Sequence, residues 1–254
     1  MKITILGSGT SSGVPRIGND WGECDPAEPR NYRTRASALV EHDGVRILID
    51  TSPDMRVQLL AAQVDRVDAV IWTHDHADHC HGIDDLRQLY HAAGTPVQGF
   101  ARRETLAALD SRFTYAFHGR SGYPSTIAGA LLPDRLTIGG IHIRVADQPH
   151  GSIHAAGLRF EADGRSIGYA TDFNIMTDDM AAMYEDLDIW VVDALRRRPH
   201  PTHMELPAVL GWVDRLQPTR TALIHMDNSM DYATLRAELP AGVEPGYDGL
   251  VLTA

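Results

Sequence analysis

The sequence predicts an α+β protein in which two β-sheets carry helices on their outer faces. Strand-like segments occur in both halves of the 254-residue chain, and several of them are paired in hairpins. Helical patterns fall mainly between the later strands of each half, so these helices have to cover the sheets from outside. No linker, low-complexity stretch or repeat divides the chain, and we therefore expect a single domain spanning residues 1–254.

The first half begins with an apolar strand and a glycine-rich loop. Asp43-Gly44 is a strong signal for a tight turn, and it joins two strands as a hairpin. Pro53 suits the first turn of a helix. The short apolar run ending at Trp72 is typical of a buried strand. We expect these elements in order: strand 2–6, loop 7–18, strands 36–42 and 45–50, helix 53–62, strand 68–72, helix 84–92, strand 96–100 and helix 102–109.

The segment 111–126 is aromatic and irregular, and we expect it to form a lid or a contact between subunits. After it, the second half again has strands in hairpins followed by helices between later strands. Asp163-Gly164 predicts another hairpin turn. We expect these elements in order: strands 135–138, 141–146, 156–162 and 165–171, helix 178–185, strand 188–193, helix 206–216, strand 220–225 and helix 231–238.

Composition and charge exclude several classes of protein. The formal charge of −11 argues against broad binding of long nucleic acid, which depends on lysine and arginine contacts to phosphates. No apolar run approaches the roughly 20 residues of a membrane span. The N-terminus enters a strand at once and lacks a signal-peptide pattern. Cys24 and Cys80 are too few for a disulfide framework, so we expect a protein of the reducing cytoplasm.

A dense group of metal-ligand side chains follows the strand expected at 68–72. Residues 74–79 read His-Asp-His-Ala-Asp-His, which places three imidazoles and two carboxylates within six positions. This density is the compositional sign of metal binding, and the ligands suit zinc, manganese or iron; the alternative is a solvated polar loop. Their spacing lets His74 and His76 converge on one ion, while Asp78 and His79 can reach a second.

A short turn cannot complete two metal sites, so further ligands must come from later in the chain. Three candidates stand at the ends of expected strands, namely His150, Asp172 and His225. Each of them could instead be a structural residue with satisfied hydrogen bonds. Asp75 should point away from the first ion, where it can accept a hydrogen bond from a ligand imidazole.

These motifs, in this order, resemble the metallo-β-lactamase superfamily of two-metal hydrolases. The resemblance covers nearly the whole chain and rests on Thr73–His79, His150, Thr171-Asp172-Phe173 and Ile224-His225-Met226. It implies an αββα sandwich of two mixed β-sheets packed face to face. It also implies that Asp50 supports the metal loop. The ligands it implies are His74, His76 and His150 on one divalent ion, Asp78, His79 and His225 on the other, and Asp172 between the two.

Two further segments look like the phosphoribosyl cyclic phosphate phosphodiesterases and, more distantly, ribonuclease Z. These segments are Gly7–Pro15 and Leu195–His203. The resemblance implies that His203 lies beside the metals and transfers a proton, and we assign catalysis to His203 and Asp78. The chain departs from the pattern where some relatives carry a cysteine-rich loop with a structural zinc, because only Cys24 stands there.

The glycine-rich loop does not fit a dinucleotide-binding motif, because Ser12 occupies the place of the third glycine. We expect instead a loop that approaches the substrate closely. Ser11 and Ser12 either contact a phosphate or satisfy the backbone of the loop itself.

Two other features have open interpretations. The run Arg196–Arg198 either binds phosphate or forms a solvated charge cluster. Thr202 and Glu205 fit a capping box, although Pro207 fits better in the first turn of the helix. Either start places His203 at the N-terminus of a helix, which favours an anion.

The leading hypothesis is a phosphodiesterase that uses two divalent ions, zinc or manganese, and acts on a small or cyclic phosphodiester. A hydroxide held between the ions attacks phosphorus, and His203 protonates the leaving oxygen. The alternatives are a thioester-cleaving or sulfur-oxidising enzyme of the same fold, and a non-catalytic binding protein. We also expect a homodimer, from the aromatic residues at 113–123 and the habit of the resembled phosphodiesterases.

Overall fold

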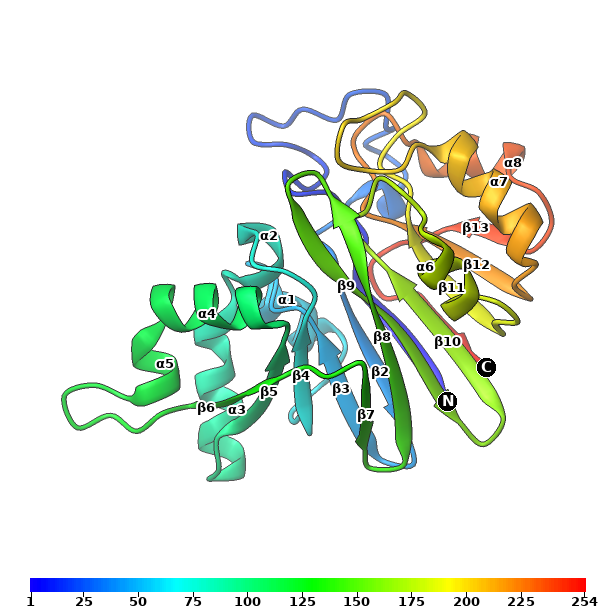
Figure 1. Cartoon of the computed structure of the whole chain (residues 1–254). Helices are drawn as coiled ribbons and strands as arrows, with labels where there is room; N and C mark the ends of the chain where they lie inside the picture. Colours follow the sequence, from blue (N-terminus) through cyan, green and yellow to red (C-terminus); the bar gives the residue numbers. More distant parts are fainter.

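The protein consists of two seven-stranded β-sheets that pack face to face, with helices on the outside of each (Figure 1). The computed structural model describes all 254 residues. The first sheet has the strand order β14-β1-β2-β3-β4-β5-β6, and the second has the order β13-β12-β11-β10-β9-β8-β7. The predicted αββα sandwich is therefore confirmed.

The bounds of the elements are as follows. The first sheet contains β1 (Lys2–Gly7), β2 (Ser37–His42), β3 (Val45–Ile49), β4 (Ala69–Trp72), β5 (Val97–Ala101), β6 (Ile127–Leu131) and β14 (Val251–Thr253). The second contains β7 (Arg135–Ile138), β8 (Ile141–His150), β9 (Ile153–Ala162), β10 (Arg165–Ala170), β11 (Ile189–Asp193), β12 (Arg220–Ile224) and β13 (Val243–Pro245). The helices are η1 (Pro29–Asn31), α1 (Met55–Ala61), α2 (Ala77–Cys80), η2 (Ile83–Asp85), α3 (Leu86–Ala93), α4 (Arg103–Arg112), α5 (Thr114–His118), α6 (Asp178–Met183), α7 (Leu206–Leu216) and α8 (Tyr232–Glu238).

Strand direction brings the ends of distant strands to one edge of the sandwich. In the first sheet β3, β4 and β5 pair in parallel, and in the second β10, β11 and β12 do so. Strand β8 is antiparallel to β9, which is antiparallel to β10, so β8 and β10 end at the same side. Residues that follow these strands can therefore meet even where they are far apart in the sequence.

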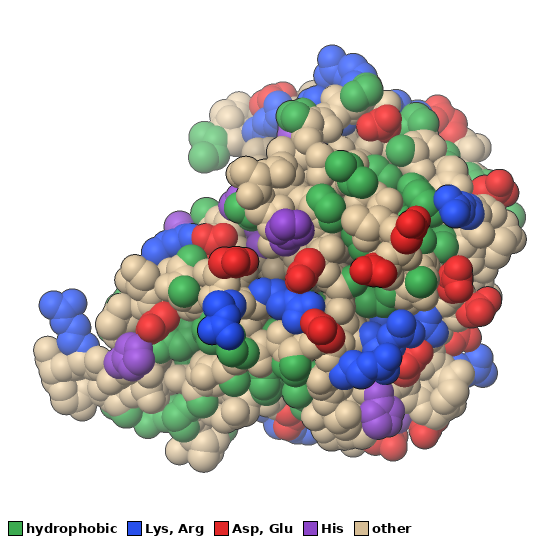
Figure 2. Space-filling model, viewed as in Figure 1, with side chains coloured by type: hydrophobic (Ala, Val, Ile, Leu, Met, Phe, Trp, Pro, Cys, Tyr) green, Lys and Arg blue, Asp and Glu red, His purple; other side chains and the backbone are tan.

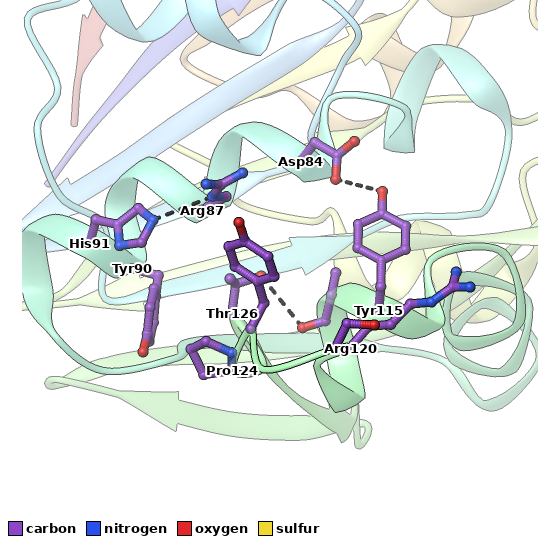
Figure 3. Close-up of a pocket in the computed structure, with 11 residues that line it drawn as sticks. Asp84, Arg87, Tyr90, His91, Tyr115, Arg120, Pro124 and Thr126 are labelled. Atoms are coloured by element: carbon purple, nitrogen blue, oxygen red, sulfur yellow. Dashed lines mark hydrogen bonds between the residues drawn. The ribbon is translucent and has the colours of Figure 1, made fainter.

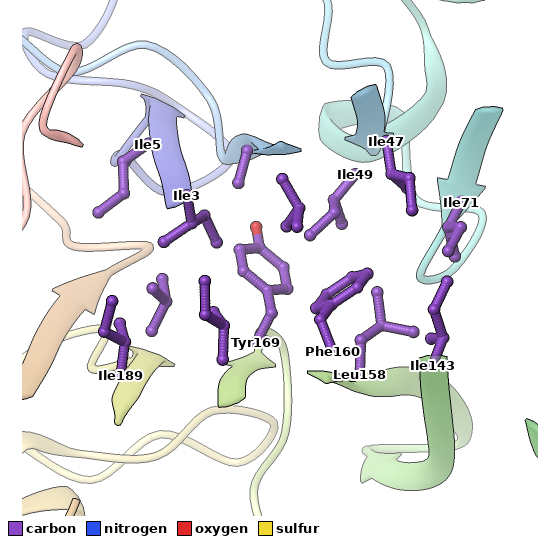
Figure 4. Packing of buried hydrophobic residues seen from close by; sticks show 14 of the residues in the cluster. Ile3, Ile5, Ile47, Ile49, Ile71, Ile143, Leu158, Phe160, Tyr169 and Ile189 are labelled. Carbon is purple, nitrogen blue, oxygen red and sulfur yellow. The ribbon is translucent and has the colours of Figure 1, made fainter. Parts of the chain in front are cut away.

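The layer between the sheets is a continuous apolar core. Ile3 and Ile47 of the first sheet and Phe160 and Tyr169 of the second belong to one buried cluster (Figure 4). Full burial of such a side chain contributes about 1.5–3 kcal/mol, so this layer fixes how the two sheets are placed. Each sheet has one further apolar cluster, which lies between the sheet and its outer helices.

Most predicted elements are present. The differences are three short edge strands, a longer β8, and the helix α5 within the segment 111–126 that was expected to be irregular. The sequence pattern does not predict β6, β13 and β14, which are three to five residues long and form edges of the sheets. Strand β8 continues to His150, well beyond the predicted end at 146, because β9 also extends and pairs with it as far as Ile153. The polar side chains of Asp147 and Gln148 interrupt the apolar pattern, so the sequence does not predict this extension.

Of the two predicted starts of α7, only the one with Pro207 in the first turn is correct. Glu205 is the N-cap residue and its side chain makes no capping hydrogen bond, while Thr202 bonds to His200 instead. The capping box of Thr202 and Glu205 is therefore wrong, and Pro207 stands in the first turn as expected. None of the helices has the length and apolar character needed to cross a membrane.

Candidate metal centre

Seven side chains predicted as ligands meet at the edge where the parallel strands end. Asp172 follows β10 and His225 follows β12, while His150 is the last residue of β8. The turn after β4 and the short helix α2 supply the other members, which are His74, His76, Asp78 and His79.

The first group consists of His74, His76 and His150 together with Asp172. The Nδ1 atom of His76 and the Nε2 atom of His150 are 3.3 Å apart. Asp172 directs Oδ2 at this group, 3.7 Å from Nε2 of His74 and 3.6 Å from Nε2 of His150. Three imidazole nitrogens and a carboxylate oxygen thus surround one position.

The second group consists of Asp78, His79 and His225. Oδ2 of Asp78 lies 3.4 Å from Nε2 of His79 and 3.5 Å from Nε2 of His225. Asp172 directs its other oxygen, Oδ1, at this group, at 3.2 Å from His79 and 3.5 Å from His225. One carboxylate therefore faces both groups, one oxygen to each.

The hydrogen bonds around the histidines fit metal ligands. Nδ1 of His150 lies 2.8 Å from the carbonyl oxygen of Thr202, which can only accept, so this nitrogen carries the proton. Nδ1 of His79 lies 2.8 Å from Asp50 and donates in the same way. In the neutral form, each ring would therefore present an unprotonated Nε2 to the other ligands. In His79, Nε2 is buried and has no hydrogen-bond partner.

Nδ1 of His74 also donates a hydrogen bond, in this case to the hydroxyl of Thr73. The Thr73 hydroxyl lies 2.8 Å from Asp50 Oδ2 and gives its proton there, so it accepts from Nδ1 of His74 at 3.0 Å. Nε2 of His74 is buried without a partner. Buried lone pairs that face one another are costly, and a divalent cation would satisfy them. The residues present therefore fit a metal centre.

The local electrostatics differ between the two groups. Burial opposes the charged form of His79, but the carboxylates of Asp172, Asp78 and Asp50 outweigh it and raise the pKa of this imidazole. In the first group burial dominates. Burial lowers the pKa of His74, His76 and His150, which favours neutral imidazoles. Burial alone would raise the pKa of Asp172, but the charges of His225 and His79 outweigh it and hold that pKa well below the ordinary value. Asp172 is thus an anion between the two groups.

Three site residues share an unusual backbone conformation. Asp50, Asp172 and His225 have φ angles of 62°, 53° and 57°, in the left-handed region that residues other than glycine seldom adopt. Each of these conformations costs about 1–3 kcal/mol and is kept only where the surrounding structure demands it. Here each turns the chain sharply at the end of a strand, so that the side chain points into the centre.

His203 lies beside the two groups and is oriented by a buried aspartate. Its Nδ1 is 2.7 Å from Oδ2 of Asp193, and its Nε2 is 3.8 Å from Oδ2 of Asp172. Its ring stacks on that of His225, with centroids 4.8 Å apart. Burial opposes the charged form of His203, yet the Asp193 carboxylate outweighs this and raises the pKa to about 9. His203 precedes α7 by three residues and does not sit on its N-terminus, contrary to expectation.

Asp193 is a site residue that sequence reasoning missed. It is fully buried at the end of β11 and, with Asp172, His203 and His225, forms a further group that could hold a cation. The signal was present, because an aspartate ends an apolar strand here just as Asp172 follows the neighbouring one. His200 was also missed, and its ring centroid lies 5.1 Å from that of His203.

Some predicted contacts are absent from the centre. Asp75 pairs with Arg112 and contacts none of the ligand imidazoles, so the expected hydrogen bond to a ligand is wrong. The support comes from Asp50, as the resemblance implied, through Thr73 and His79. In the run 196–198, Arg196 donates to carbonyl oxygens of its own loop and Arg197 pairs with Glu238.

The aromatic segment 111–126 contributes to a separate pocket of about 530 Å³ (Figure 3). Tyr115 of α5 donates a hydrogen bond of 2.5 Å to Asp84, and Arg87 lies over the ring of Tyr123 at 5.5 Å. Burial and the bond to Asp84 raise the pKa of Tyr115 to about 12. None of the seven predicted ligands lines this pocket.

A sandwich of two sheets with a histidine and aspartate centre at the strand ends defines a metal-dependent hydrolase. Residues 45–226 match the family model of the β-lactamase superfamily domain. The chain therefore belongs to the metallo-β-lactamase superfamily, as the motifs predicted.

Solved structures agree with this assignment. A diphosphatase of the PhnP family is 34% identical with a TM-score of 0.91, and the match covers 100% of this chain and 97% of that one. Zinc-bound PqqB from Methylobacterium extorquens has a TM-score of 0.79 at 20% identity, over 100% of both chains. The short form of human tRNase Z has a TM-score of 0.71 at 15% identity, over 100% of this chain and 99% of that one. The relationship to the PhnP family is confirmed, and the likeness to tRNase Z shows that the fold is shared.

A curated relative carries an unrelated name. The octanoyltransferase of Porphyromonas gingivalis is 31% identical over 260 residues, which is 98% of this chain but only 51% of that protein. The chain thus spans about half the length of the curated relatives it matches. The name of that relative describes the whole of a protein about twice as long, and the match covers only 51% of it.

Proposed function

We propose that the protein is a dinuclear metal-dependent phosphodiesterase that hydrolyses a small or cyclic phosphodiester. The observation that carries the proposal is Asp172, whose two carboxylate oxygens face two separate ligand groups. A second ion is useful where charge on phosphate oxygens has to be neutralised, and it would be superfluous for a mononuclear redox centre.

In this proposal the ligands divide as the resemblance implies. His74, His76 and His150 would hold one zinc or manganese ion, Asp78, His79 and His225 would hold the other, and Asp172 has an oxygen facing each group. When bound, the ions would lower the pKa of water and neutralise the phosphate oxygens. Asp50 fixes the turn that carries the ligands, because it accepts hydrogen bonds from Thr73 and His79.

The remaining chemistry falls to His203. As the P–O bond to the leaving group breaks, the displaced oxygen needs a proton, and Nε2 of His203 faces the centre to donate it. Asp193 accepts from Nδ1 and so holds the ring in this orientation. The similarity of 34% to a PhnP-family diphosphatase supports phosphoryl chemistry at this centre.

A small substrate suits the surface of the protein. The net charge is −11, and positive and negative side chains alternate over the face in Figure 2 without a continuous basic area. A long polyanion would meet repulsion over such a surface, whereas a small phosphodiester needs only the positive charge of the bound ions.

The test is a panel of cyclic and linear phosphodiesters assayed with the protein loaded with zinc or with manganese, alongside elemental analysis. We expect two metal ions per chain and turnover of at least one cyclic phosphodiester. A single iron with oxygen consumption and no phosphodiesterase activity would instead indicate the sulfur-oxidising class. Hydrolysis of thioesters alone would also refute the proposal.

A further inference from the structure

The pocket of about 530 Å³ shown in Figure 3 lies between α3 and α5, apart from the metal centre. Its lining comes from η2 and α3 on one side and from α5 and the loop at 119–126 on the other. The volume falls in the range of small-ligand sites. None of the residues at the proposed metal centre lines this pocket, so a molecule bound here would not be a substrate at that centre.

The pocket carries a net positive charge in a protein whose net charge is −11. Arg87 and Arg120 line it, whereas Asp84 is its only carboxylate and already accepts a hydrogen bond of 2.5 Å from Tyr115. Nε of Arg87 bonds to His91 at 3.3 Å, and its two terminal nitrogens have no partner. The side chain of Arg120 makes neither a hydrogen bond nor an ion pair. Both guanidinium groups therefore keep donors free for an anion.

Three tyrosines give the same pocket flat aromatic walls. They are Tyr90 of α3, Tyr115 of α5 and Tyr123 of the loop, and the guanidinium of Arg87 lies over the ring of Tyr123 at 5.5 Å. Tyr123 is 67% exposed and Tyr115 is 40% exposed, so packing within the chain does not cover these rings. Exposed aromatic rings around a cavity are suited to stacking on a planar ligand.

The loop that closes the pocket has a defined shape. Arg120 and Tyr123 exchange two backbone hydrogen bonds of 3.0 Å across a two-residue turn. The turn residues, Ser121 and Gly122, have φ angles of 53° and 87°, which a tight hairpin turn requires. A Cβ atom at Gly119 would come within 2.4 Å of the carbonyl oxygen of Tyr123, so only glycine lets the loop fold back at the end of α5. The cationic and aromatic groups of the loop are thus held in place relative to α5.

We infer that this pocket is a second ligand site, which binds a small molecule that joins a planar ring to a phosphate, as a nucleoside monophosphate does. Arg87 and Arg120 bind the phosphate, and the tyrosine rings stack on the planar ring. Neither group alone explains the lining, because free guanidinium donors call for an anion whereas exposed aromatic rings call for a flat apolar surface. The inference does not depend on which reaction the metal centre catalyses.

The test is calorimetric titration of adenosine 5′-monophosphate into the metal-loaded protein, with adenosine and ribose 5-phosphate as the two halves of this probe. We expect Arg87→Gln to weaken binding of the whole probe about 10- to 100-fold, and Arg87→Lys to recover part of the loss. Tyr90→Leu should weaken it at least about fivefold, whereas Tyr90→Phe, which keeps the ring, should change it less than about twofold. Arg236→Gln, an exposed arginine on α8, is the matched control.

The two halves of the probe separate the two kinds of contact. Binding of adenosine should not respond to Arg87→Gln, and binding of ribose 5-phosphate should not respond to Tyr90→Leu. Asp172→Ala separates the pocket from the metal centre, because Asp172 faces both ligand groups and does not line the pocket. If Asp172→Ala loses the probe while Arg87→Gln binds it normally, the probe occupies the metal centre and the inference is overturned. No binding by the wild-type protein, or equal affinities of Arg87→Gln and Arg236→Gln, would refute it as well.

Discussion

His203 offers the sharpest test of the proposed chemistry. In the proposed centre seven other residues would supply the ligands, and Nε2 of His203 lies 3.8 Å from the nearest oxygen of Asp172. We therefore expect His203→Ala to keep both metal ions and to lose turnover by about 10²–10⁴, the usual contribution of a general acid. The loss should be far smaller for a substrate with a nitrophenolate leaving group, because that oxygen needs little protonation.

The substitution also affects a buried carboxylate, and the design has to allow for it. Removing the ring leaves Asp193 without its partner at Nδ1, which costs about 1–3 kcal/mol of stability. His203→Asn restores a donor toward Asp193 and should recover the thermal midpoint but not the rate. His200→Ala is the matched control, since its ring lies 5.1 Å from that of His203 yet contacts no carboxylate.

The assay is steady-state hydrolysis of a cyclic phosphodiester and of its nitrophenyl counterpart, with metal content measured on each preparation. Loss of a metal ion in His203→Ala would show that His203 is a ligand, as its place in the group with Asp172, Asp193 and His225 allows. Equal losses on both substrates would show that His203 binds or positions the substrate. Either result refutes its role as the proton donor.

Three other predictions concern the centre, the stability and the assembly. Asp172→Ala should abolish activity and lower metal content, because one carboxylate faces both ligand groups, whereas Asp75→Ala should do neither; unchanged metal content in the first variant would exclude a bridge. Burial opposes ionisation of Asp231, but hydrogen bonds from Thr234 and Asn31 outweigh it and lower its pKa to about 2. Its stabilisation is therefore present above about pH 4 and disappears as the pH falls through about 2, so Asp231→Asn should lower the stability in urea unfolding more at pH 7 than near pH 2, by a small amount because the carboxylate is partly solvated; a pH-independent difference would contradict this. We expect a homodimer in light scattering that Tyr123→Asp weakens, because this exposed tyrosine lies in the aromatic segment; a monomer mass for the wild-type protein at micromolar concentration would count against it.

Local sequence was enough to locate most of the centre. The imidazoles and carboxylates at 74–79 lie so close together that no tertiary information is needed to bring them to one place. His150, Asp172 and His225 were found because a polar residue at the end of an apolar strand points to a rim where strands end. The hairpin turns at Asp43-Gly44 and Asp163-Gly164 were equally predictable, since they require the same left-handed backbone wherever they occur.

Contacts between distant segments were decided only by the tertiary structure. Asp193 looks like any strand end until β11 is placed beside β10 and β12, which brings it within 2.7 Å of His203. Arg87 and Arg120 are distant in the sequence and have ordinary neighbours, and they line one pocket because the loop after α5 folds back beside α3. Asp172 follows the end of β10 in a left-handed conformation, and its two oxygens there face ligands from the ends of three other strands. Residue types and their spacing thus determined which ligands and proton donors the chain can supply. The packing of the two sheets determined which other side chains orient these groups, because the hydrogen bonds and shared cavities form between strand ends that are distant in sequence.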